Sequence, residues 1–223
     1  GANIVICARR VKNLERLKEE IDGEVLVLPL DVTSEKSVAE FFNSVEEKIG
    51  TADILINNAG TSDPKRFKDL DEESWNYVLN TNLNGAYRVA KNFTDQLIKS
   101  KKSGSIVNIA SILGLRVGFN LSSYATAKAG LIQLTKSMAL ELARSNIRVN
   151  AIAPGYILTE INDDFFATKE GQDYINNIPM RRLGLESDLD GILLLLASDA
   201  SSFMTGSIIP VSYTHLTLPT SRS

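Results

Sequence analysis

The chain has 223 residues, which is enough for a domain with a sizeable core and no need of disulfide or metal staples. Lys and Arg number 24 against 27 for Asp and Glu, and the net charge of −3 argues against a nucleic-acid or membrane-surface protein. One Cys and one His argue against disulfide scaffolds, Cys/His metal sites and His-based triads, which leaves Ser, Tyr, Lys, Asn and carboxylates to carry chemistry.

Short apolar runs rich in Val and Ile alternate along the chain with longer segments of helical spacing. The runs predict strands at Asn3–Ala8, Glu24–Leu28, Asp53–Asn57, Ser105–Ala110, Ile147–Ala153 and Ser207–Ile209. The segments between them predict helices at Val11–Ile21, Glu35–Ile49 (capped by Ser34 and stopped by Gly50), Glu72–Ser100 with a break near Asn80, Ser123–Arg144 and Asp188–Ser198. This order predicts a single α/β domain with a doubly wound parallel sheet, which binds ligands beyond the carboxyl ends of its strands.

The segment Tyr156–Arg182 has weaker periodicity and contains Gly171 and Pro179, which favours a mobile helical lid. No apolar run approaches the roughly 20 residues that cross a membrane. The start of the chain has no secretory signal pattern. We therefore expect a soluble, cytoplasmic protein.

Both ends of the chain are unusual. The first residue is Gly1 and a strand-like run follows directly, so we expect the natural N-terminus to be missing. At the other end, Val211–Thr220 has no helical or strand period and resembles a translated sequencing adapter of the transposase type. We expect residues 1–210 to form the domain and residues 211–223 to be an artefactual tail, with a genuine disordered tail as the alternative.

Tyr124 and Lys128 lie four residues apart in a strongly helical segment, so their side chains share one face. A tyrosine base at neutral pH needs a pKa lowered by ~2–3 units, or ~3–4 kcal/mol, and an ammonium ~5 Å away at an effective dielectric of ~20 supplies ~3 kcal/mol. Alone this spacing is weak, and a surface pair is the simpler interpretation. However, Ser111 closes one predicted strand, Asn57-Asn58-Ala59-Gly60 ends another and Pro154-Gly155 follows a third. These strand ends indicate one crevice.

Together with Asn82-Leu83-Asn84-Gly85, Ala197-Ser198-Asp199 and Thr205-Gly206, these motifs resemble the short-chain dehydrogenase/reductase family from Gly1 to about Ile209. The resemblance implies a Rossmann-like fold and hydride transfer between a nicotinamide cofactor and a carbonyl or alcohol. It also implies a catalytic tetrad: Tyr124 as acid and base, Ser111 holding the substrate oxygen, Lys128 lowering the tyrosine pKa and binding the nicotinamide ribose, and Asn82 positioning a water in the proton relay.

Two departures from the family pattern stand out. Family members begin with a strand, a glycine-rich turn and a helix that bind the pyrophosphate, and the sequence lacks that unit and with it the central strand. The family also places Asp-Gly-Gly after its last strand, whereas Ser212-Tyr213 follows Val211 here. We interpret this second departure as loss of native sequence.

Arg9 follows the strand at whose end the family discriminates between cofactors, and Ala8 stands where an acid would bind ribose hydroxyls. This pattern favours NADP over NAD, although Arg9 could simply solubilise a helix start. Asp31 resembles the residue that faces the adenine, or else is a turn residue before Ser34. The remaining cofactor contacts that the resemblance implies are Asn58, Ala59, Gly60, Tyr124, Lys128, Pro154, Gly155, Ile157 and Thr159.

The expected partner is a small carbonyl or alcohol substrate, with no nucleic acid, membrane or metal. A 3-oxoacyl thioester reductase and a sugar or polyol dehydrogenase both fit the tetrad, and family members commonly form homotetramers. A non-catalytic dinucleotide sensor or scaffold is the alternative, against which the complete tetrad argues. The aromatic residues Phe119, Tyr156, Phe165 and Phe166 could wall an apolar substrate pocket or simply pack onto the domain.

Overall fold

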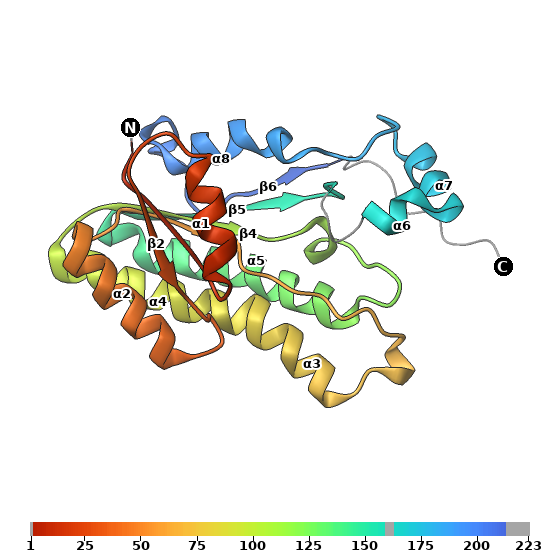
Figure 1. The fold of residues 1–223 in the computed structure, drawn as a ribbon, viewed down its shortest axis with the longest axis horizontal. Coiled ribbons are helices and arrows are strands. Elements are labelled where there is room, and N and C mark those ends of the chain that lie inside the picture. Colours follow the sequence, from red (N-terminus) through yellow and green to blue (C-terminus); the bar gives the residue numbers. More distant parts are fainter. Residues whose placement is uncertain (1, 159–162, 213–223) are drawn as a thin grey trace.

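The chain folds into a parallel β-sheet with helices on both faces (Figure 1). The computed structural model describes residues 2–158 and 163–212, apart from the side chains of 163, 165 and 174. The strands are β1 (Ile4–Ala8), β2 (Val25–Pro29), β3 (Ile54–Asn57), β4 (Gly104–Ile109), β5 (Ile147–Pro154) and β6 (Ile208–Val211). The helices are α1 (Val11–Glu19), α2 (Glu35–Ile49), α3 (Glu72–Leu79), α4 (Ala86–Ser100), α5 (Ser122–Leu142), α6 (Asp163–Ala167), α7 (Lys169–Asn177) and α8 (Asp190–Ala197). The predicted α/β class with a doubly wound parallel sheet is confirmed.

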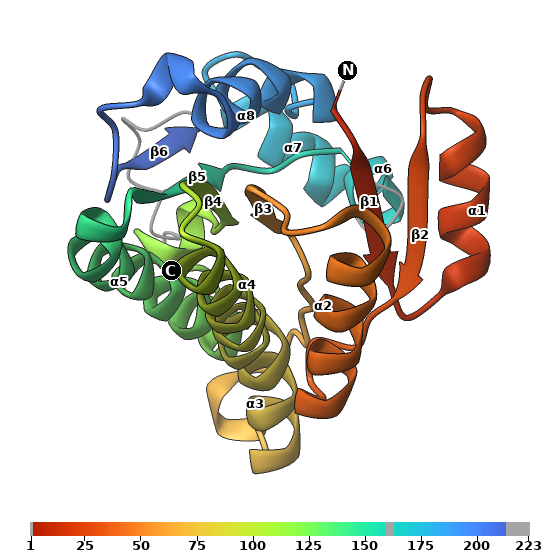
Figure 2. The same ribbon diagram turned by 90° about the vertical axis from the view of Figure 1, so that its left-hand side faces the viewer.

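The sheet consists of two separate ladders. β1 pairs with β2, while β3, β4, β5 and β6 pair in that order, and every pair is parallel. In Figure 2, β1 and β3 are the facing members of the two ladders. Within residues 2–158 and 163–212, no strand pairs with the facing edge of either one. This break lies between β1 and β3, where the sequence predicts that a central strand is absent.

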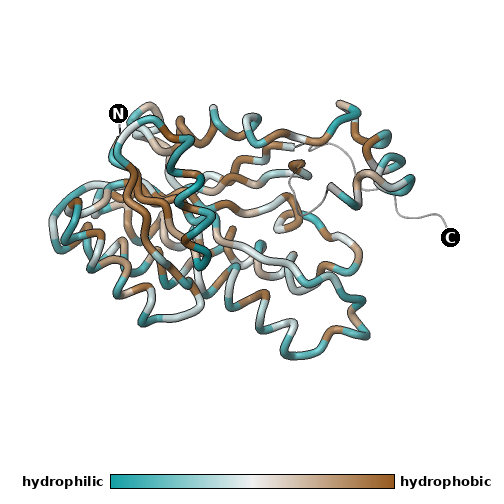
Figure 3. Tube along the Cα trace, viewed as in Figure 1, coloured by the Kyte–Doolittle hydropathy of each residue, from teal (hydrophilic) through white to brown (hydrophobic). Residues whose placement is uncertain are grey.

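Strand β4 illustrates how both faces of the sheet are buried. Its Ile106 belongs to the core cluster that contains Phe93 and Leu97 of α4, whereas the next residue, Val107, clusters with Leu196 of α8. Successive side chains of a strand point to opposite faces, so helices on both faces leave neither residue exposed. Figure 3 shows hydrophobic residues concentrated along the strands and hydrophilic residues on the outer helix surfaces.

The predicted elements agree with the observed ones to within a few residues. Ser34 caps α2 by accepting a hydrogen bond from the Ser37 N–H at 3.2 Å, and Gly50 ends that helix with φ +82°. The break expected near Asn80 is a π-helical turn, Asn80–Gly85, between α3 and α4. α1 ends before the predicted Ile21, because the N–H groups of the last predicted residues bond three positions back and close the helix.

The C-terminal strand runs further than the sequence predicts. β6 extends to Val211, which pairs with Pro154 of β5, so the predicted domain boundary at residue 210 falls inside this strand. Pro210 and Val211 also pair with β5, which makes the strand longer than its short apolar run indicates. Residues 213–223, most of the expected artefactual tail, lie outside the described residues.

The predicted lid region is helical, as expected, and consists of α6, α7 and the turns that follow. Phe166, Ile178 and Leu183 form a small buried cluster of their own, against which Tyr156 packs. This cluster is separate from the main core, so the region can be stabilised without contributions from the central sheet. Among the described residues, no helix combines the length and apolar character needed to cross a membrane.

Candidate active site

Three strand ends supply the predicted site, all on the carboxyl edge of the β3–β6 ladder. Ser111 follows β4 and is buried, and its Oγ accepts a hydrogen bond from the Leu113 N–H at 3.1 Å, which caps a short 3₁₀ turn at Ile112–Gly114. Asn58, Ala59 and Gly60 follow β3, and Pro154 and Gly155 follow β5. The parallel arrangement therefore brings these motifs to one edge of the sheet, as the sequence predicts.

The first turns of α5 place Tyr124 and Lys128 beside Ser111. Lys128 is only 4% exposed, and its Nζ donates to the Ile109 carbonyl at the end of β4 over 2.7 Å. The same Nζ lies 5.7 Å from the centroid of the Tyr124 ring. Within the described residues, the Ile109 carbonyl is the one acceptor of the Lys128 ammonium. Because the ammonium has three N–H bonds, donors remain for the hydroxyl groups of a ligand.

The pKa values of Tyr124 and Lys128 are both shifted, and burial is the largest cause of each shift. Burial raises the pKa of Tyr124, with an opposing effect from its hydrogen bond with Ser111 and a smaller upward effect from Tyr156. Burial also lowers the pKa of Lys128 to about 8. Lys128 is not among the causes of the Tyr124 shift, since its ammonium donates to the Ile109 carbonyl, and the expectation that Lys128 lowers the tyrosine pKa stays a prediction.

Asn82 is fully buried on the π-helical turn and is held from both ends of its amide group. Its Oδ1 accepts from the Thr61 N–H at 2.8 Å, and its Nδ2 donates to the Thr61 carbonyl, also at 2.8 Å. A Cβ at the neighbouring Gly60 would lie 3.7 Å from both Asn82 Oδ1 and Lys128 Nζ, so these three residues meet at one point. Through these two bonds, the Asn82 side chain anchors the loop after β3.

The loop after β5 is clamped to the segment that follows α7. Ile157 forms a parallel bridge with Gly184, the Leu158 N–H donates to the Gly184 carbonyl at 2.8 Å, and the Gly184 N–H donates to the Tyr156 carbonyl at 3.0 Å. A cavity of about 240 Å³ lies beside this clamp and is lined in part by Tyr156, Ile157 and Met180. Thr159, a predicted cofactor contact, lies outside the described residues.

The predicted adenosine-end residues lie on the other ladder. Arg9 is exposed after β1, and Asp31 follows β2, where its Oδ1 accepts from both the N–H and the hydroxyl of Thr33. These hydrogen bonds, and to a smaller degree the charge of Arg9, lower the pKa of Asp31. Asp31 therefore makes the hydrogen bonds of a turn residue through Oδ1, and its contact with the adenine stays a prediction.

The aromatic candidates divide into two groups. Phe119 is 82% exposed on the loop before α5. Tyr156 and Phe166 stack edge to face, with their ring centroids 5.8 Å apart, and the buried Phe166 packs within the lid. The side chain of residue 165 lies outside the described residues. Phe166 therefore follows the packing interpretation, while Phe119 is accessible to a substrate.

Sequence reasoning missed the main-chain groups that hold the site. The Thr61 peptide groups fix Asn82, and the Ile109 carbonyl fixes Lys128. Neither residue type gives a signal for such a role, since every residue carries these donors and acceptors. Only the position of Ile109 at the end of β4, and of Thr61 in the loop after β3, could have indicated it.

The fold, the strand-end motifs and the Tyr-Lys helix define a nicotinamide-dependent oxidoreductase, and comparison with known proteins gives its family. The family model described as enoyl-(acyl carrier protein) reductase matches residues 1–213. The chain belongs to the short-chain dehydrogenase/reductase family and is an NAD(P)-dependent oxidoreductase acting on a CH–OH group.

Its relatives cover nearly the whole chain. It is 36% identical over 214 residues to the 3-oxoacyl-(acyl-carrier-protein) reductase of Thermotoga maritima, covering 95% of this chain and 86% of that protein. It is 34% identical over 216 residues to the reductase of the same name from Aquifex aeolicus, with 95% and 86% covered. A short-chain type dehydrogenase/reductase from Mycobacterium marinum superimposes with a TM-score of 0.91 at 32% identity, with 97% and 87% covered.

Proposed function

We propose that this protein reduces a carbonyl group with a nicotinamide cofactor and that Asn82, Ser111, Tyr124 and Lys128 form its catalytic tetrad. The proposal rests on the position of Lys128. Its buried ammonium lies beside Gly60, Asn82 and the Tyr124 ring at the carboxyl edge of the sheet. A buried lysine with donors to spare suits the ribose hydroxyls of the cofactor. When bound, the cofactor supplies the hydride.

The protein's own groups would handle the substrate oxygen and its proton. Ser111 lies close enough to Tyr124 to lower the pKa of its phenol, and the two hydroxyls would share the substrate oxygen between them. Because burial raises the pKa of Tyr124, its phenol is protonated near neutral pH and can act as the acid in reduction. Besides its two bonds to Thr61, the Asn82 amide has a second N–H and a second oxygen lone pair, which would position a water of the proton relay.

We favour a 3-oxoacyl thioester as substrate over an oxidised sugar. The curated relatives from Thermotoga maritima and Aquifex aeolicus are 3-oxoacyl-(acyl-carrier-protein) reductases. The loop between Ser111 and α5 also exposes Val117 and Phe119, which are 79% and 82% accessible and can contact an acyl chain more favourably than a polyol. Turnover with NADPH on a panel of acyl thioesters, simple ketones and oxidised sugars tests this. Faster turnover of a sugar than of every thioester would contradict it.

The adenosine end favours NADP, since Arg9 is exposed next to Asp31 and can reach a 2′-phosphate. We expect Arg9→Asp to reverse the cofactor preference toward NAD, because the charge-assisted contact is worth ~1.5–3 kcal/mol. Titration with NADPH and NADH measures the change. Arg10→Asp is the matched control and should leave the preference nearly unaltered. A wild-type protein that already binds NADH more tightly would refute this assignment.

We also propose that the protein acts in the cytoplasm as a closed, symmetric homotetramer. The long helices α4 and α5 expose large apolar side chains, including Tyr87 and Ile98 on α4 and Leu140 on α5, which is 82% accessible. Packing these helices between subunits would bury that surface. Light scattering at micromolar concentration should give the mass of a tetramer, and Leu140→Glu should lower it. A monomer mass for the wild-type chain would contradict the proposal.

A further inference from the structure

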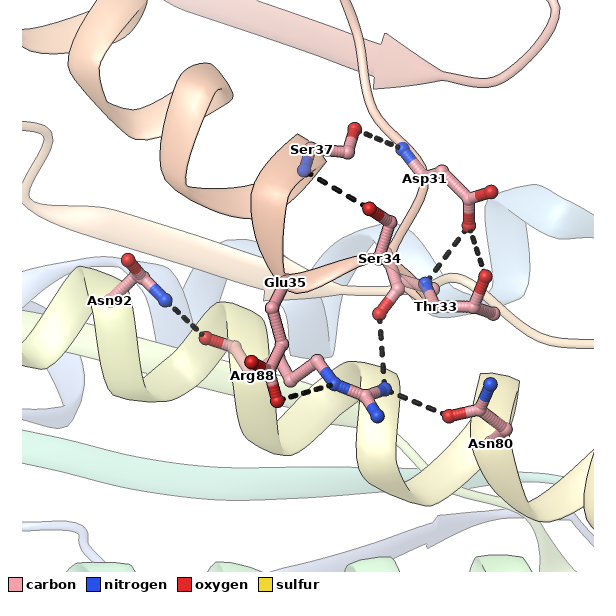
Figure 4. Close-up of polar contacts among 9 residues, drawn as sticks. Asp31, Thr33, Ser34, Glu35, Ser37, Asn80, Arg88 and Asn92 are labelled. Atoms are coloured by element: carbon pink, nitrogen blue, oxygen red, sulfur yellow. Dashed lines mark hydrogen bonds and ion pairs between the residues drawn. The ribbon is translucent and has the colours of Figure 1, made fainter.

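Arg88 on α4 joins two parts of the molecule that belong to different ladders of the sheet (Figure 4). Its Nη1 donates to the Asn80 Oδ1 at 2.9 Å and to the Val32 carbonyl at 3.4 Å. Asn80 begins the π-helical turn that carries Asn82, whereas Val32 lies in the loop after β2, next to Asp31. One guanidinium therefore bonds to both segments.

The two segments that Arg88 joins are also in van der Waals contact. A Cβ added to Gly85, the last residue of the π-helical turn, would lie 2.7 Å from Val32 Cγ2, so the glycine is what lets the loop approach. Within that loop, Thr33 bonds to Asp31, and the Asp31 N–H donates to the Ser37 Oγ at 3.0 Å. The loop is thus ordered internally, and its attachment to the π-helical turn depends on Arg88 and the Val32–Gly85 contact.

The ion pair on the outer side of Arg88 contributes little to this arrangement. Its Nε lies 3.9 Å from Glu35 Oε1, but that carboxylate is 89% exposed while the Arg88 side chain is only 20% exposed. Exposed pairs of this kind are weak. A partly buried guanidinium that donates to a side-chain amide and a main-chain carbonyl constrains geometry more strongly.

We propose that Arg88 is a positioning residue that couples the loop at residues 31–34 to the π-helical turn carrying Asn82. This inference rests on the proposed function of that site, in which one segment serves the adenosine end and the other the proton relay. The coupling matters because the two ladders share no strand pairing within the described residues. Movement of the loop would then reach Asn82 through Arg88 and, from there, the Thr61 peptide that Asn82 holds.

Amide hydrogen exchange of the 223-residue chain tests the coupling without requiring activity. We expect Arg88→Met to speed exchange by about ten-fold or more both at residues 31–34 and at Thr61 and the π-helical turn. Arg88→Lys should restore part of the protection, since an ammonium can still donate to one acceptor. Gln96→Ala is the matched control: Gln96 joins α4 to α2 by donating to the Phe42 carbonyl at 3.0 Å, but it lies about two turns of helix closer to the C-terminal end of α4 than Arg88.

The outcomes separate coupling from a merely structural role. Faster exchange at only one of the two segments, or the same pattern in Gln96→Ala, would overturn the proposal. If Arg88→Met unfolds the chain, Asn80→Ala decides: it removes one acceptor, and exchange at residues 31–34 should still rise, whereas no change there refutes the coupling.

In a form that turns over substrate, Arg88→Met should raise the KM for NADPH as well as lower kcat. A wild-type protein inactive on every substrate would count against the proposed function alone.

Discussion

A version of this chain with a strand, a glycine-rich turn and a helix added before β1 is expected to melt at a higher temperature and to bind NADPH more tightly than the 223-residue chain. The reason is that the facing edges of β1 and β3 have no strand partner among residues 2–158 and 163–212, and a parallel strand between them would pair with both. Each buried polar group left unpaired costs ~1–3 kcal/mol, and a domain has only ~5–15 kcal/mol of stability. The added turn would also supply main-chain donors for the pyrophosphate.

The apolar surface of β3 strengthens this expectation. Ile54 and Ile56 are 43% and 36% exposed on one face of the strand, while Leu55 on the other face packs against the main core cluster. A helix following the added strand would cover these isoleucines, adding about 25 cal/mol for each Å² of apolar surface removed from water. The melting temperature should rise by on the order of 10 °C, since ~1 kcal/mol corresponds to ~2–4 °C in a domain of this size.

Differential scanning calorimetry and NADPH titration measure the two effects. The matched control carries a Pro in the middle of the added strand, which keeps the added mass but removes a ladder hydrogen bond. It should lose most of the gain in melting temperature. If the 223-residue chain itself melts cooperatively at the same temperature and binds NADPH at micromolar concentration, the free edges carry no such cost.

The elements that sequence reasoning placed best are those with local signals. Ser34 and Gly50 bound α2 as predicted, because capping and a positive φ depend on residue type at one position. The break near Asn80 was also predictable as an interruption. Its π-helical form was not, because the residue types of Asn80–Gly85 carry no signal that distinguishes a π-helical turn from another interruption.

In the candidate site, too, the positions of residues could be predicted from the sequence, but their burial could not. The positions of Ser111, Tyr124 and Lys128 follow from strand ends and helical spacing, which the sequence contains. The direction of the Tyr124 pKa does not, because spacing reports the proximity of Lys128 but not the burial that desolvates the phenol. Arg88 could not be found either, since an arginine on a helix is most simply a solvated surface residue until its acceptors at Asn80 and Val32 are known.

Replacing Tyr124 by Phe is expected to lower kcat by ~10²–10⁴-fold, the effect typical of losing a general acid. The ring would still pack where it is, because only the hydroxyl is removed. Cofactor affinity should change little, since Lys128 keeps its bond to the Ile109 carbonyl and remains available to the ribose. The measurement is steady-state turnover with NADPH in whichever form of the chain, extended or not, binds the cofactor.

Tyr156→Phe is the matched control for this change, because Tyr156 lies close enough to influence the pKa of Tyr124 but is not proposed to donate the proton. It should keep kcat within about tenfold of the wild type, a smaller loss than that of a general acid. In Tyr124→Phe, by contrast, the phenylalanine cannot donate a proton. That variant should therefore also lose the dependence of kcat on the ionisation of Tyr124. A Tyr124→Phe protein that retains more than about a tenth of wild-type turnover would show that another group donates the proton, since the acid's contribution is ~10²-fold or more.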